Sequence, residues 1–477
     1  MRAGEAVPVT VPALRGPAGA GATLAGRRVV VVGLARSGLA ACRLLVRLGA
    51  RVVATDAKPG EALPPDVAAL RDLGIVLMLG GHPDGLLADA DVVVVSPGVP
   101  RTAPLVQRAR AAGVPVMGEV ELAYWSTEAR FAAVTGSNGK STTTALLGAL
   151  LRAAGIPCTV AGNIGVPLCG VVPDLPADHW VVAEISSFQL ETTVAFRPAV
   201  GVLLNLAPNH LDRHADLEEY YGTKARLFAA QQQEDCAVVN ADDPEALGRT
   251  TAGRARRVTF SRRRAVRVGA FLDGDRIVLA GGDRMAPVAP AGCLRIPGAH
   301  NLENALAAVA AAAEIGARPS AMAAALAAFP GLEHRLEAVA TAGGVRYIND
   351  SKGTTVDAVG RSLESFPGGI LLIAGGKDKG GDFRPLRPLV RERVKGLILM
   401  GEARAKIQEH LAGAAPVVAA ESMEAAVRAA ADRAAPGDVV LLSPGCASFD
   451  MFRDYEDRGR AFKAAVAALK AGMTNDQ

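Results

Sequence analysis

The stretch from Val134 to Thr144, VTGSNGKSTTT, combines two glycines, one lysine and a run of hydroxyl side chains. An apolar run, Phe131 to Val134, precedes it, and an Ala/Leu-rich segment of helical character follows. Glycines let backbone N–H groups turn onto phosphate oxygens, and the start of a helix adds a partial positive charge. Lys140 adds a full positive charge, and a hydroxyl group can ligate Mg²⁺. The stretch therefore predicts a strand, a phosphate-binding loop and a helix that bind a nucleoside triphosphate.

The spacing of this loop departs from the usual P-loop, in which a further glycine stands about five residues before the Gly-Lys pair. Val134 occupies that position, so the loop has only Gly136 and Gly139. The alternative is an ordinary Gly/Ser turn before a helix. The strand and helix signals on both sides favour the phosphate loop.

Further polar groups follow along the same region. Glu184 stands near the end of an apolar strand, Trp180 to Ile185, where a carboxylate is costly unless it meets a cation or donors. We expect it to bind Mg²⁺ opposite the phosphates. His210 and His214 follow Pro208 in a predicted loop, where zinc binding is one alternative and a role at the magnesium and phosphate site is better motivated. Lys224 lies in a predicted helix over 218–230, where most lysines are solvated.

The N-terminal region begins with a β-α-β pattern. A strand over 29–33 leads through a turn into an apolar helix, and a second strand ends at Asp56, about twenty positions after the glycine turn. The turn, Gly33 to Gly38, lacks the middle glycine of a dinucleotide fingerprint, so it is a weak signal by itself. Another strand ends in Ser96-Pro97-Gly98, at the edge where open α/β sheets place ligands. Both loops remain open to the alternative of simple structural turns.

The remaining chain repeats the pattern of strands that end in polar loops. The segment His300 to Asn304 begins an Ala-rich helix, and Pro330-Gly331 marks a boundary. Beyond it, three strands lead to Asp350 to Thr355, to a loop with Lys379 and to a loop with Ser448. We expect a second open α/β sheet with its polar loops at one edge.

Bulk properties limit the class of protein. A chain of 477 residues suggests about three domains, and no apolar run approaches the roughly 20 residues that cross a bilayer. The net charge of +4 is dispersed, and the arginine-rich stretch 254–267 lacks interleaved aromatics, so neither nucleic acid nor membrane is an expected partner. Six isolated cysteines suit a reducing compartment. We expect a cytoplasmic monomer with a flexible extension over 1–25 that is no signal peptide.

Four motifs form a set that resembles the Mur ligase superfamily, most closely its D-glutamate-adding members. They are TGSNGKST (135–142), EISSFQLE (184–191), NDSK (349–352) and SPGCASFDMF (443–452). The resemblance covers the whole chain after the extension and implies an α/β fold of three domains. These are a Rossmann-like domain over 26–118 for a UDP-linked substrate, a central P-loop ATPase-type domain over 119–330 and a C-terminal open-sheet domain over 331–477 for the amino acid.

The resemblance also implies the activity, which is ATP-dependent addition of D-glutamate to UDP-N-acetylmuramoyl-L-alanine (UDP-MurNAc-L-Ala) through an acyl phosphate, in the cytoplasmic stage of peptidoglycan synthesis. The residues that it implies for catalysis are Lys140, Glu184, His210 and Lys224. For ATP they are Gly136, Ser137, Asn138, Gly139, Lys140, Ser141, Thr142, Asn304, Arg335, Asp350 and Lys352. For two magnesium ions they are Ser141, Glu184, His210 and Lys224 as a carbamate. For the other substrates they are Ser37, Ser96, Pro97, Gly98, Asn163, His210, Thr354, Lys379, Ser448, Phe449 and Tyr455.

The sequence departs from better-known members at two places. Ala57-Lys58 stands where they carry a threonine and an arginine at the uracil and diphosphate, and Tyr455 stands where some have phenylalanine. The alternative within the same chemistry is another ATP-dependent amino-acid ligase, either a different Mur ligase or one of the folylpolyglutamate synthase type. A nicotinamide-dependent dehydrogenase would leave the phosphate loop, Glu184 and Lys224 unexplained. The last alternative is a binding module that responds to a nucleotide but catalyses no reaction. Phosphate release that requires both co-substrates would exclude it.

Overall fold

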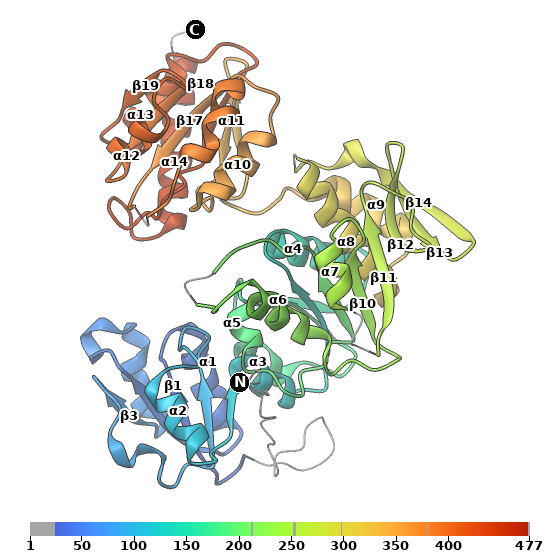
Figure 1. Cartoon of the computed structure of the whole chain (residues 1–477), viewed down its shortest axis with the longest axis vertical. Coiled ribbons are helices and arrows are strands. Elements are labelled where there is room, and N and C mark those ends of the chain that lie inside the picture. Colours follow the sequence, from blue (N-terminus) through green and yellow to red (C-terminus); the bar gives the residue numbers. More distant parts are fainter. Residues whose placement is uncertain (1–23, 211–212, 251–253, 297, 379, 476–477) are drawn as a thin grey trace, which may run out of the picture. The chain divides into compact units, whose positions relative to one another are not determined.

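The computed structural model describes residues 24–475, except 211–212, 251–253, 297 and 379. Three separate sheets of five, nine and six strands confirm the predicted three-domain α/β class (Figure 1). The described chain divides into two compact units, one running to Cys293 together with Glu303–Leu326, the other comprising Leu294–Leu302 and the residues from Ala327 onward. No helix in the described part of the chain has the length and apolar character needed to cross a membrane.

The first sheet is fully parallel, with the strand order β3-β2-β1-β4-β5. Its strands are β1 (Arg28–Val32), β2 (Arg51–Asp56), β3 (Val76–Leu79), β4 (Val92–Val95) and β5 (Val116–Gly118), and its helices are α1 (Arg36–Arg47) and α2 (Pro104–Ala111). Short 3₁₀ turns cover Gly60–Ala62, Pro65–Leu73 and Asp84–Leu87. The order reverses between β1 and β4, and ligands of open α/β sheets bind where it reverses. The loops after these two strands are therefore placed together at the ligand-binding edge.

Close packing explains one glycine of the first turn. A Cβ atom on Gly38, in the first turn of α1, would lie 1.9 Å from the carbonyl oxygen of Gly33. Only glycine lets the helix start this close to the end of β1, which places the amino end of α1 at the carboxyl edge of the sheet.

The second sheet has the order β14-β13-β12-β11-β10-β9-β6-β8-β7 and is parallel from β7 to β12, with β13 and β14 antiparallel. Its strands are β6 (Arg130–Thr135), β7 (Cys158–Gly162), β8 (Trp180–Glu184), β9 (Val200–Leu203), β10 (Cys236–Asn240), β11 (Arg256–Ser261), β12 (Val268–Asp273), β13 (Arg276–Gly281) and β14 (Arg284–Pro290). Its helices are α3 (Glu119–Trp125), α4 (Lys140–Ala153), α5 (Ser187–Leu190), α6 (Leu217–Ala225), α7 (Pro244–Arg249), α8 (Ala299–Ile315) and α9 (Pro319–Ala328). One hydrophobic cluster continues from α1 into this sheet, so the first two sheets share a core.

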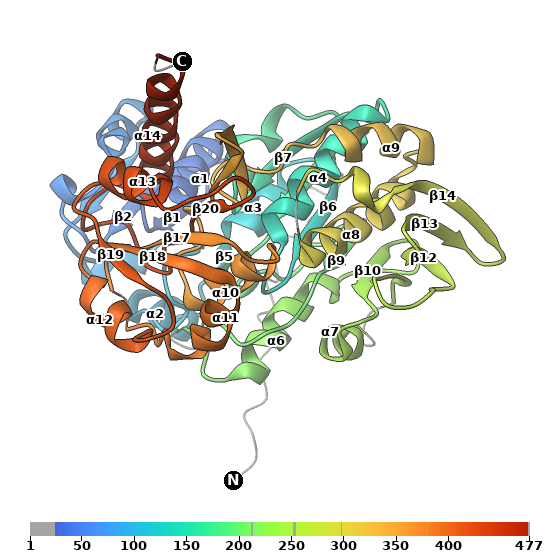
Figure 2. The same cartoon turned by 90° about the horizontal axis from the view of Figure 1, so that it is seen from above.

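The third sheet has the order β15-β16-β20-β17-β18-β19, and only the β15–β16 pair is antiparallel. Its strands are β15 (Glu337–Ala342), β16 (Val345–Asn349), β17 (Ile370–Gly375), β18 (Val394–Met400), β19 (Val417–Ala419) and β20 (Val439–Leu442). Its helices are α10 (Val356–Glu364), α11 (Arg387–Arg393), α12 (Arg404–His410), α13 (Met423–Ala431) and α14 (Tyr455–Asn475). Two hydrophobic clusters cover its two faces, and α13 and α14 lie side by side on one of them (Figure 2).

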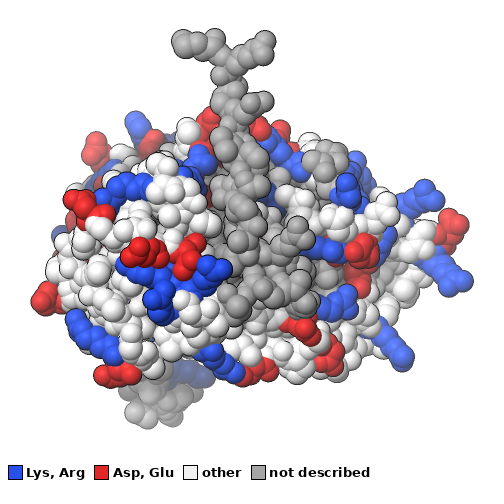
Figure 3. Space-filling model, turned by 90° about the horizontal axis from the view of Figure 1, so that it is seen from below, with Lys and Arg blue, Asp and Glu red and all other residues white. Residues whose placement is uncertain are grey.

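The structure also bears on several local predictions from the sequence. The helix expected over 218–230 ends at Ala225 and continues as a 3₁₀ turn, Arg226–Phe228. All six cysteines are free, four of them buried, as expected for small core residues. Most arginines of the described part of 254–267 are exposed on β11 and the loop after it. Figure 3 shows basic and acidic side chains interspersed over one face, in agreement with the dispersed charge.

Candidate functional site

The phosphate loop joins β6 to α4 in the predicted strand–loop–helix form. Gly136 and Gly139 both have positive φ angles, 152° and 82°, which non-glycine residues rarely adopt. The Asn205 side chain, in the segment that follows the neighbouring strand β9, accepts a hydrogen bond from the Asn138 N–H at 2.9 Å and so holds the loop. A Cβ atom on Gly139 would lie 2.1 Å from Oδ1 of Asn304, so glycine is needed for this close approach. The structure thus brings Asn304, predicted as a nucleotide contact, directly against the loop.

Two lysines lie at this loop. Nζ of Lys140 donates to the carbonyl oxygens of Gly136 and Ser137 at 2.9 and 3.0 Å, and Nζ of Lys224 donates to Gly136 at 2.9 Å. Lys224 is only 1% exposed, and its ammonium lies 4.7 Å from the ring centre of Tyr220. Burial, together with the charge of Lys140, lowers the pKa of Lys224 well below its usual value. The reading of Lys224 as a solvated helix lysine is therefore wrong, because α6 turns this side chain into the protein.

Glu184 ends β8 beside the phosphate loop and is 2% exposed. One carboxylate oxygen accepts a hydrogen bond from Nδ2 of Asn163 at 2.7 Å, and the other is buried and accepts none from the described protein. A buried carboxylate oxygen without a donor is costly unless a cation meets it. The site therefore fits a hard cation such as Mg²⁺, for which carboxylate oxygens are preferred ligands.

The two histidines of the predicted loop have different environments. His210 is exposed, with a positive φ of 55°, and its ring centre lies 5.0 Å from that of Phe188. His214 is buried, and its Nε2 lies 3.2 Å from Oγ of Ser187. In the described part of the chain, the group with metal-ligand geometry is Glu333, His334 and Glu337, so zinc binding by the two histidines is not supported. Lys463 already pairs with both carboxylates of that group at 2.7 Å.

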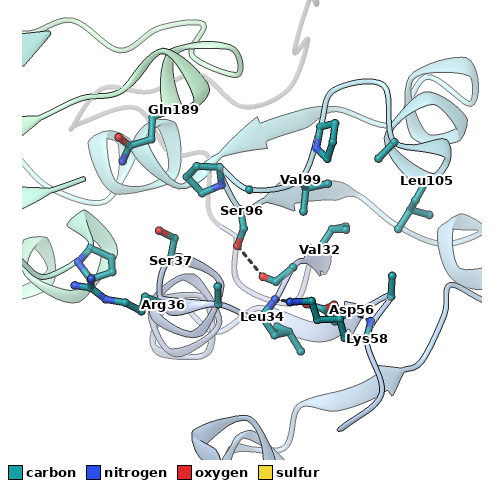
Figure 4. Close-up of a pocket in the computed structure, with 18 of the residues that line it drawn as sticks. Val32, Leu34, Arg36, Ser37, Asp56, Lys58, Ser96, Val99, Leu105 and Gln189 are labelled. Carbon is teal, nitrogen blue, oxygen red and sulfur yellow. Dashed lines mark hydrogen bonds between the residues drawn. The ribbon is translucent and has the colours of Figure 1, made fainter. Parts of the chain in front are cut away.

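A pocket of about 740 Å³ lies at the reversal of the first sheet and extends to the loop of Asn163 (Figure 4). The residues predicted for the UDP end of the substrate line it, namely Ser37, Ser96, Pro97 and Gly98. Asn163, predicted with His210 to flank the muramoyl-alanine part, lines it too, whereas His210 does not. Oγ of Ser96 donates to the carbonyl oxygen of Gly33 at 2.7 Å, and Asp56 accepts from the Leu34 N–H at 2.8 Å. These two bonds hold together the loops after β1, β2 and β4. The glycine turn therefore borders a pocket, and the binding of a ligand by these loops stays a prediction.

Sequence reasoning missed three further residues that line this pocket, Arg36, His82 and Gln189. Lys58, which stands where better-known members carry an arginine, lines it as well. Arg36 and Lys58 bring positive charge to a pocket that lies at the start of α1, and the partial positive charge of a helix start favours anions. The guanidinium of Arg36 also donates to the carbonyl oxygen of Gly165. A diphosphate group would suit this part of the pocket.

The C-terminal unit gathers the loops after β16, β17 and β20. Asp350 is buried, and its carboxylate accepts from Oγ of Ser362 at 2.6 Å and from Oγ of Ser443 at 2.8 Å. Burial raises the pKa of Asp350 to about 6. Its oxygens thus organise the ends of two strands, β16 and β20.

Other predicted residues lie on the same loops. Nζ of Lys352 lies 3.7 Å from the ring centre of Tyr455, and the Gly445 N–H donates to the carbonyl oxygen of Gly353 at 2.8 Å. Ser448 is buried, whereas Phe449 is 66% exposed. Thr354 and Arg335 lie on the loops after β16 and before β15, and Lys379 lies outside the described residues. Lys352, Thr354 and Ser448 are therefore placed on adjoining loops of one sheet edge.

These features define a multidomain α/β protein with a phosphate-type loop and a separate pocket at the edge of its first sheet. Comparison with protein families gives a Mur ligase MurD-like N-terminal domain over 27–118, a Mur ligase middle domain over 134–312 and a Mur ligase glutamate ligase domain over 334–446. The chain belongs to the Mur ligase family, in the branch whose members are named UDP-N-acetylmuramoylalanine–D-glutamate ligase.

Two relatives of that name illustrate the similarity. The protein from Acidobacterium capsulatum is 48% identical over 449 residues, which cover 93% of this chain and 97% of the relative. The protein from Pelotomaculum thermopropionicum is 47% identical over 448 residues, which cover 94% and 98%. Among solved structures, a pseudomurein peptide ligase type C from Methanothermus fervidus (18% identity, TM-score 0.59) and UDP-N-acetylmuramate–alanine ligase from Thermotoga maritima (20% identity, TM-score 0.58) share the fold. Each covers 93% of this chain, and the whole of the solved chain is matched.

Proposed function

We propose that this protein joins D-glutamate to UDP-MurNAc-L-Ala at the expense of ATP, in the cytoplasmic stage of peptidoglycan synthesis. The observation that carries the proposal is the position of Asn163. It lines the pocket of about 740 Å³ at the edge of the first sheet, and its side-chain amide donates a hydrogen bond to Glu184 beside the phosphate loop. One residue thereby links the place of the substrate to the place where phosphate is transferred. Full-length relatives at 43–48% identity carry the name of this activity.

The proposed reaction has two steps. The terminal carboxylate of UDP-MurNAc-L-Ala attacks the γ-phosphate of ATP, which gives an acyl phosphate and ADP. The amine of D-glutamate then attacks the acyl carbon, and phosphate leaves with the bonding electron pair. The first step brings two anions together, so positioning and charge neutralisation supply most of the catalysis.

The residues of the central domain suit these demands. The proposed nucleotide contacts here are Gly136, Ser137, Asn138, Gly139, Lys140, Ser141, Thr142 and Asn304. Lys140 neutralises phosphate charge, and Glu184, Ser141 and His210 are the proposed protein ligands for two magnesium ions. When bound, the metal supplies charge neutralisation between the phosphates and the attacking carboxylate.

Lys224 has a special place in this proposal. Its lowered pKa leaves more of the amine unprotonated, and a free amine can add CO₂ to form a carbamate. Carbamylation would turn a cation beside Lys140 into an anion, which removes the repulsion between the two lysines. The carbamate is then a further ligand of the magnesium site.

The C-terminal unit is proposed to supply the amino acid. Thr354, Lys379, Ser448, Phe449 and Tyr455 are the proposed D-glutamate residues, and Arg335, Asp350 and Lys352 are further nucleotide contacts. A substrate with two carboxylates needs a cation and several hydroxyl or backbone donors. We also propose that the protein acts as a monomer in the cytoplasm.

The test measures phosphate release from ATP and Mg²⁺ with UDP-MurNAc-L-Ala, and compares D-glutamate with L-glutamate, L-alanine and diaminopimelate. Release only with D-glutamate, with a product heavier by one glutamyl residue, is the expected result. Release with another amino acid would assign a different Mur ligase specificity. Release in the absence of any UDP-linked substrate but with a folate would contradict the proposal.

A further inference from the structure

Arg458, near the start of α14, is the largest fully buried side chain in the described structure. It is 1% exposed, and the described part of the chain shows no carboxylate within ion-pair distance of it, although the charges of Asp450 and Asp350 act on it from further away. Burial lowers the pKa of its guanidinium to about 10, so the group stays charged at neutral pH. Burying a charge without a counter-ion is costly, and the fold must hold it by hydrogen bonds instead.

The hydrogen bonds of Arg458 join two loops. Nε and Nη2 donate to Oγ and the carbonyl oxygen of Ser351, at 3.0 and 2.8 Å. Nη1 donates to the carbonyl oxygens of Cys446 and Ala447, both at 3.2 Å. Only the planar, forked guanidinium reaches several acceptors in this fixed geometry. One side chain therefore connects the loop after β16 to the loop after β20.

A third loop passes close to the same group. A Cβ atom on Gly376, which follows β17, would lie 3.1 Å from Nη1 of Arg458 and 2.2 Å from the carbonyl oxygen of Ala447. The Lys377 N–H donates to that same oxygen at 2.9 Å. Arg458 thus lies where the three polar loops of this sheet edge converge.

These loops carry the residues proposed for D-glutamate. Thr354 follows Ser351 by three positions, and Ser448 comes directly after Ala447. Carbonyl oxygens carry partial negative charge, and a loop that presented them to a dicarboxylate would repel it. Arg458 donates hydrogen bonds to three such carbonyl oxygens. Its own positive charge, which forms no ion pair with a carboxylate in the described part of the chain, lies beside the loops.

We propose that Arg458 is a positioning residue for an acidic amino-acid substrate. It holds the two loops in the geometry that binds the substrate, and it withdraws the carbonyl oxygens of Ser351, Cys446 and Ala447 from the anion. The inference rests on the proposed function, and it adds a residue that makes no proposed contact with the substrate.

The test compares Arg458→Gln, which removes the charge, with Arg458→Lys, which keeps it without the fork. Because hydrogen bonds of a charged group are stronger than those of a neutral one, we expect Arg458→Gln to raise the KM for D-glutamate by roughly 10- to 100-fold. Arg458→Lys should give a smaller rise. The KM for UDP-MurNAc-L-Ala should change by no more than about twofold, because its pocket lies in the other unit.

Arg460→Gln is the matched control. Arg460 stands on the same helix, its side chain is 53% exposed, and its ion pairs are with Asp454 and Asp457. We expect the wild-type KM for D-glutamate in this variant. A folded Arg458→Gln protein with an unchanged KM for D-glutamate, or with equal rises for both substrates, would overturn the inference.

A second pair of variants covers the case in which Arg458→Gln does not fold, as judged by circular dichroism. Arg458→Lys and Ser351→Ala then carry the test, and an unchanged KM for D-glutamate in both overturns the inference. Wild-type enzyme is assayed first. If the wild type accepts only an amino acid without a second carboxylate, the proposed function and the Arg458 inference both fail. If the wild type is active with D-glutamate and the Arg458 variants have the wild-type KM for it, only the Arg458 inference fails.

Discussion

The side-chain amines of Lys140 and Lys224 share one acceptor, the carbonyl oxygen of Gly136, at 2.9 Å each. Two ammonium groups this close repel each other, and the repulsion is strongest where water is excluded. Lys224 is 1% exposed, and burial together with the charge of Lys140 lowers its pKa well below the usual value. A lowered pKa favours the unprotonated amine, which is the form that can be chemically modified.

Replacement of Lys224 by alanine should cause a severe loss of ligation, on the order of 10²- to 10³-fold in kcat, since the proposed carbamate can then no longer form. Added short carboxylates such as formate or acetate should restore part of the activity, because they can occupy the place of the carbamate. Phosphate release measured over a range of acetate concentrations checks this. Lys224→Arg, which fills the space with a permanent cation, should show no such rescue, and full activity in Lys224→Ala would exclude the carbamate.

Lys140→Ala should leave a folded protein that lacks ATP-dependent ligation. In the proposed mechanism the lysine neutralises charge that builds up during phosphoryl transfer, so its loss should lower kcat more than it weakens nucleotide binding, by about 10²-fold or more. Turnover and the affinity for a fluorescent ATP analogue give the two quantities. Near-normal turnover would show that the loop does not have the proposed role.

The phosphate loop could be predicted from sequence because its signal is local. Glycines, lysine and hydroxyls occur together within 134–144, and the strand and helix that hold them adjoin directly. The same holds for the strand ends at Glu184 and Ser96, where a short apolar run stops at a polar residue.

The burial of Lys224 and Arg458 could not be predicted in this way. Each depends on tertiary packing, since α6 directs one lysine to the phosphate loop and α14 directs one arginine between two loops. In the sequence, nothing distinguishes either residue from the other charged residues of its helix. The hydrogen bond of Asn163 to Glu184 likewise joins the residue that follows β7 to the last residue of the neighbouring strand β8, and no periodicity indicates it.

Glu184→Gln should keep the fold and lose the response to magnesium. The amide retains an oxygen that can accept the hydrogen bond from Asn163, while the oxygen without a protein donor becomes an NH₂ group that cannot ligate a cation. Magnesium-dependent binding of ATP should weaken by roughly 10-fold or more, since a charged ligand is lost. Isothermal titration with and without Mg²⁺ measures this. Glu191→Gln is a useful comparison, because Glu191 is occupied by Arg213 at 2.8 Å, and an equal loss of the magnesium response in both variants would contradict the assignment.

Glu119 offers a prediction on stability and pH. It is 1% exposed in α3, one oxygen accepts from the Cys169 N–H at 2.7 Å, and the other accepts no hydrogen bond from the described protein. Burial raises the pKa of Glu119 from 4.5 to about 7. Between these values the folded protein holds a proton that the unfolded chain has lost. The contribution to stability is thus fully present below pH 4.5 and is lost as the pH rises to about 7, by an amount on the order of 3 kcal/mol.

Glu119→Gln removes this titrating group and should remove its part of the pH dependence. We expect the melting temperature of the wild type to fall relative to that of the variant as the pH rises from 5 to 8, because only the wild type must then bury a carboxylate without a full set of donors. Thermal unfolding of both proteins at each pH measures the difference. Glu234→Gln serves as the control, since Glu234 is exposed and pairs with Arg197 at the surface. Melting curves of the wild type and Glu119→Gln that shift in parallel over this range would show that Glu119 is ionised in the folded state throughout, and that burial at the start of α3 does not hold its proton.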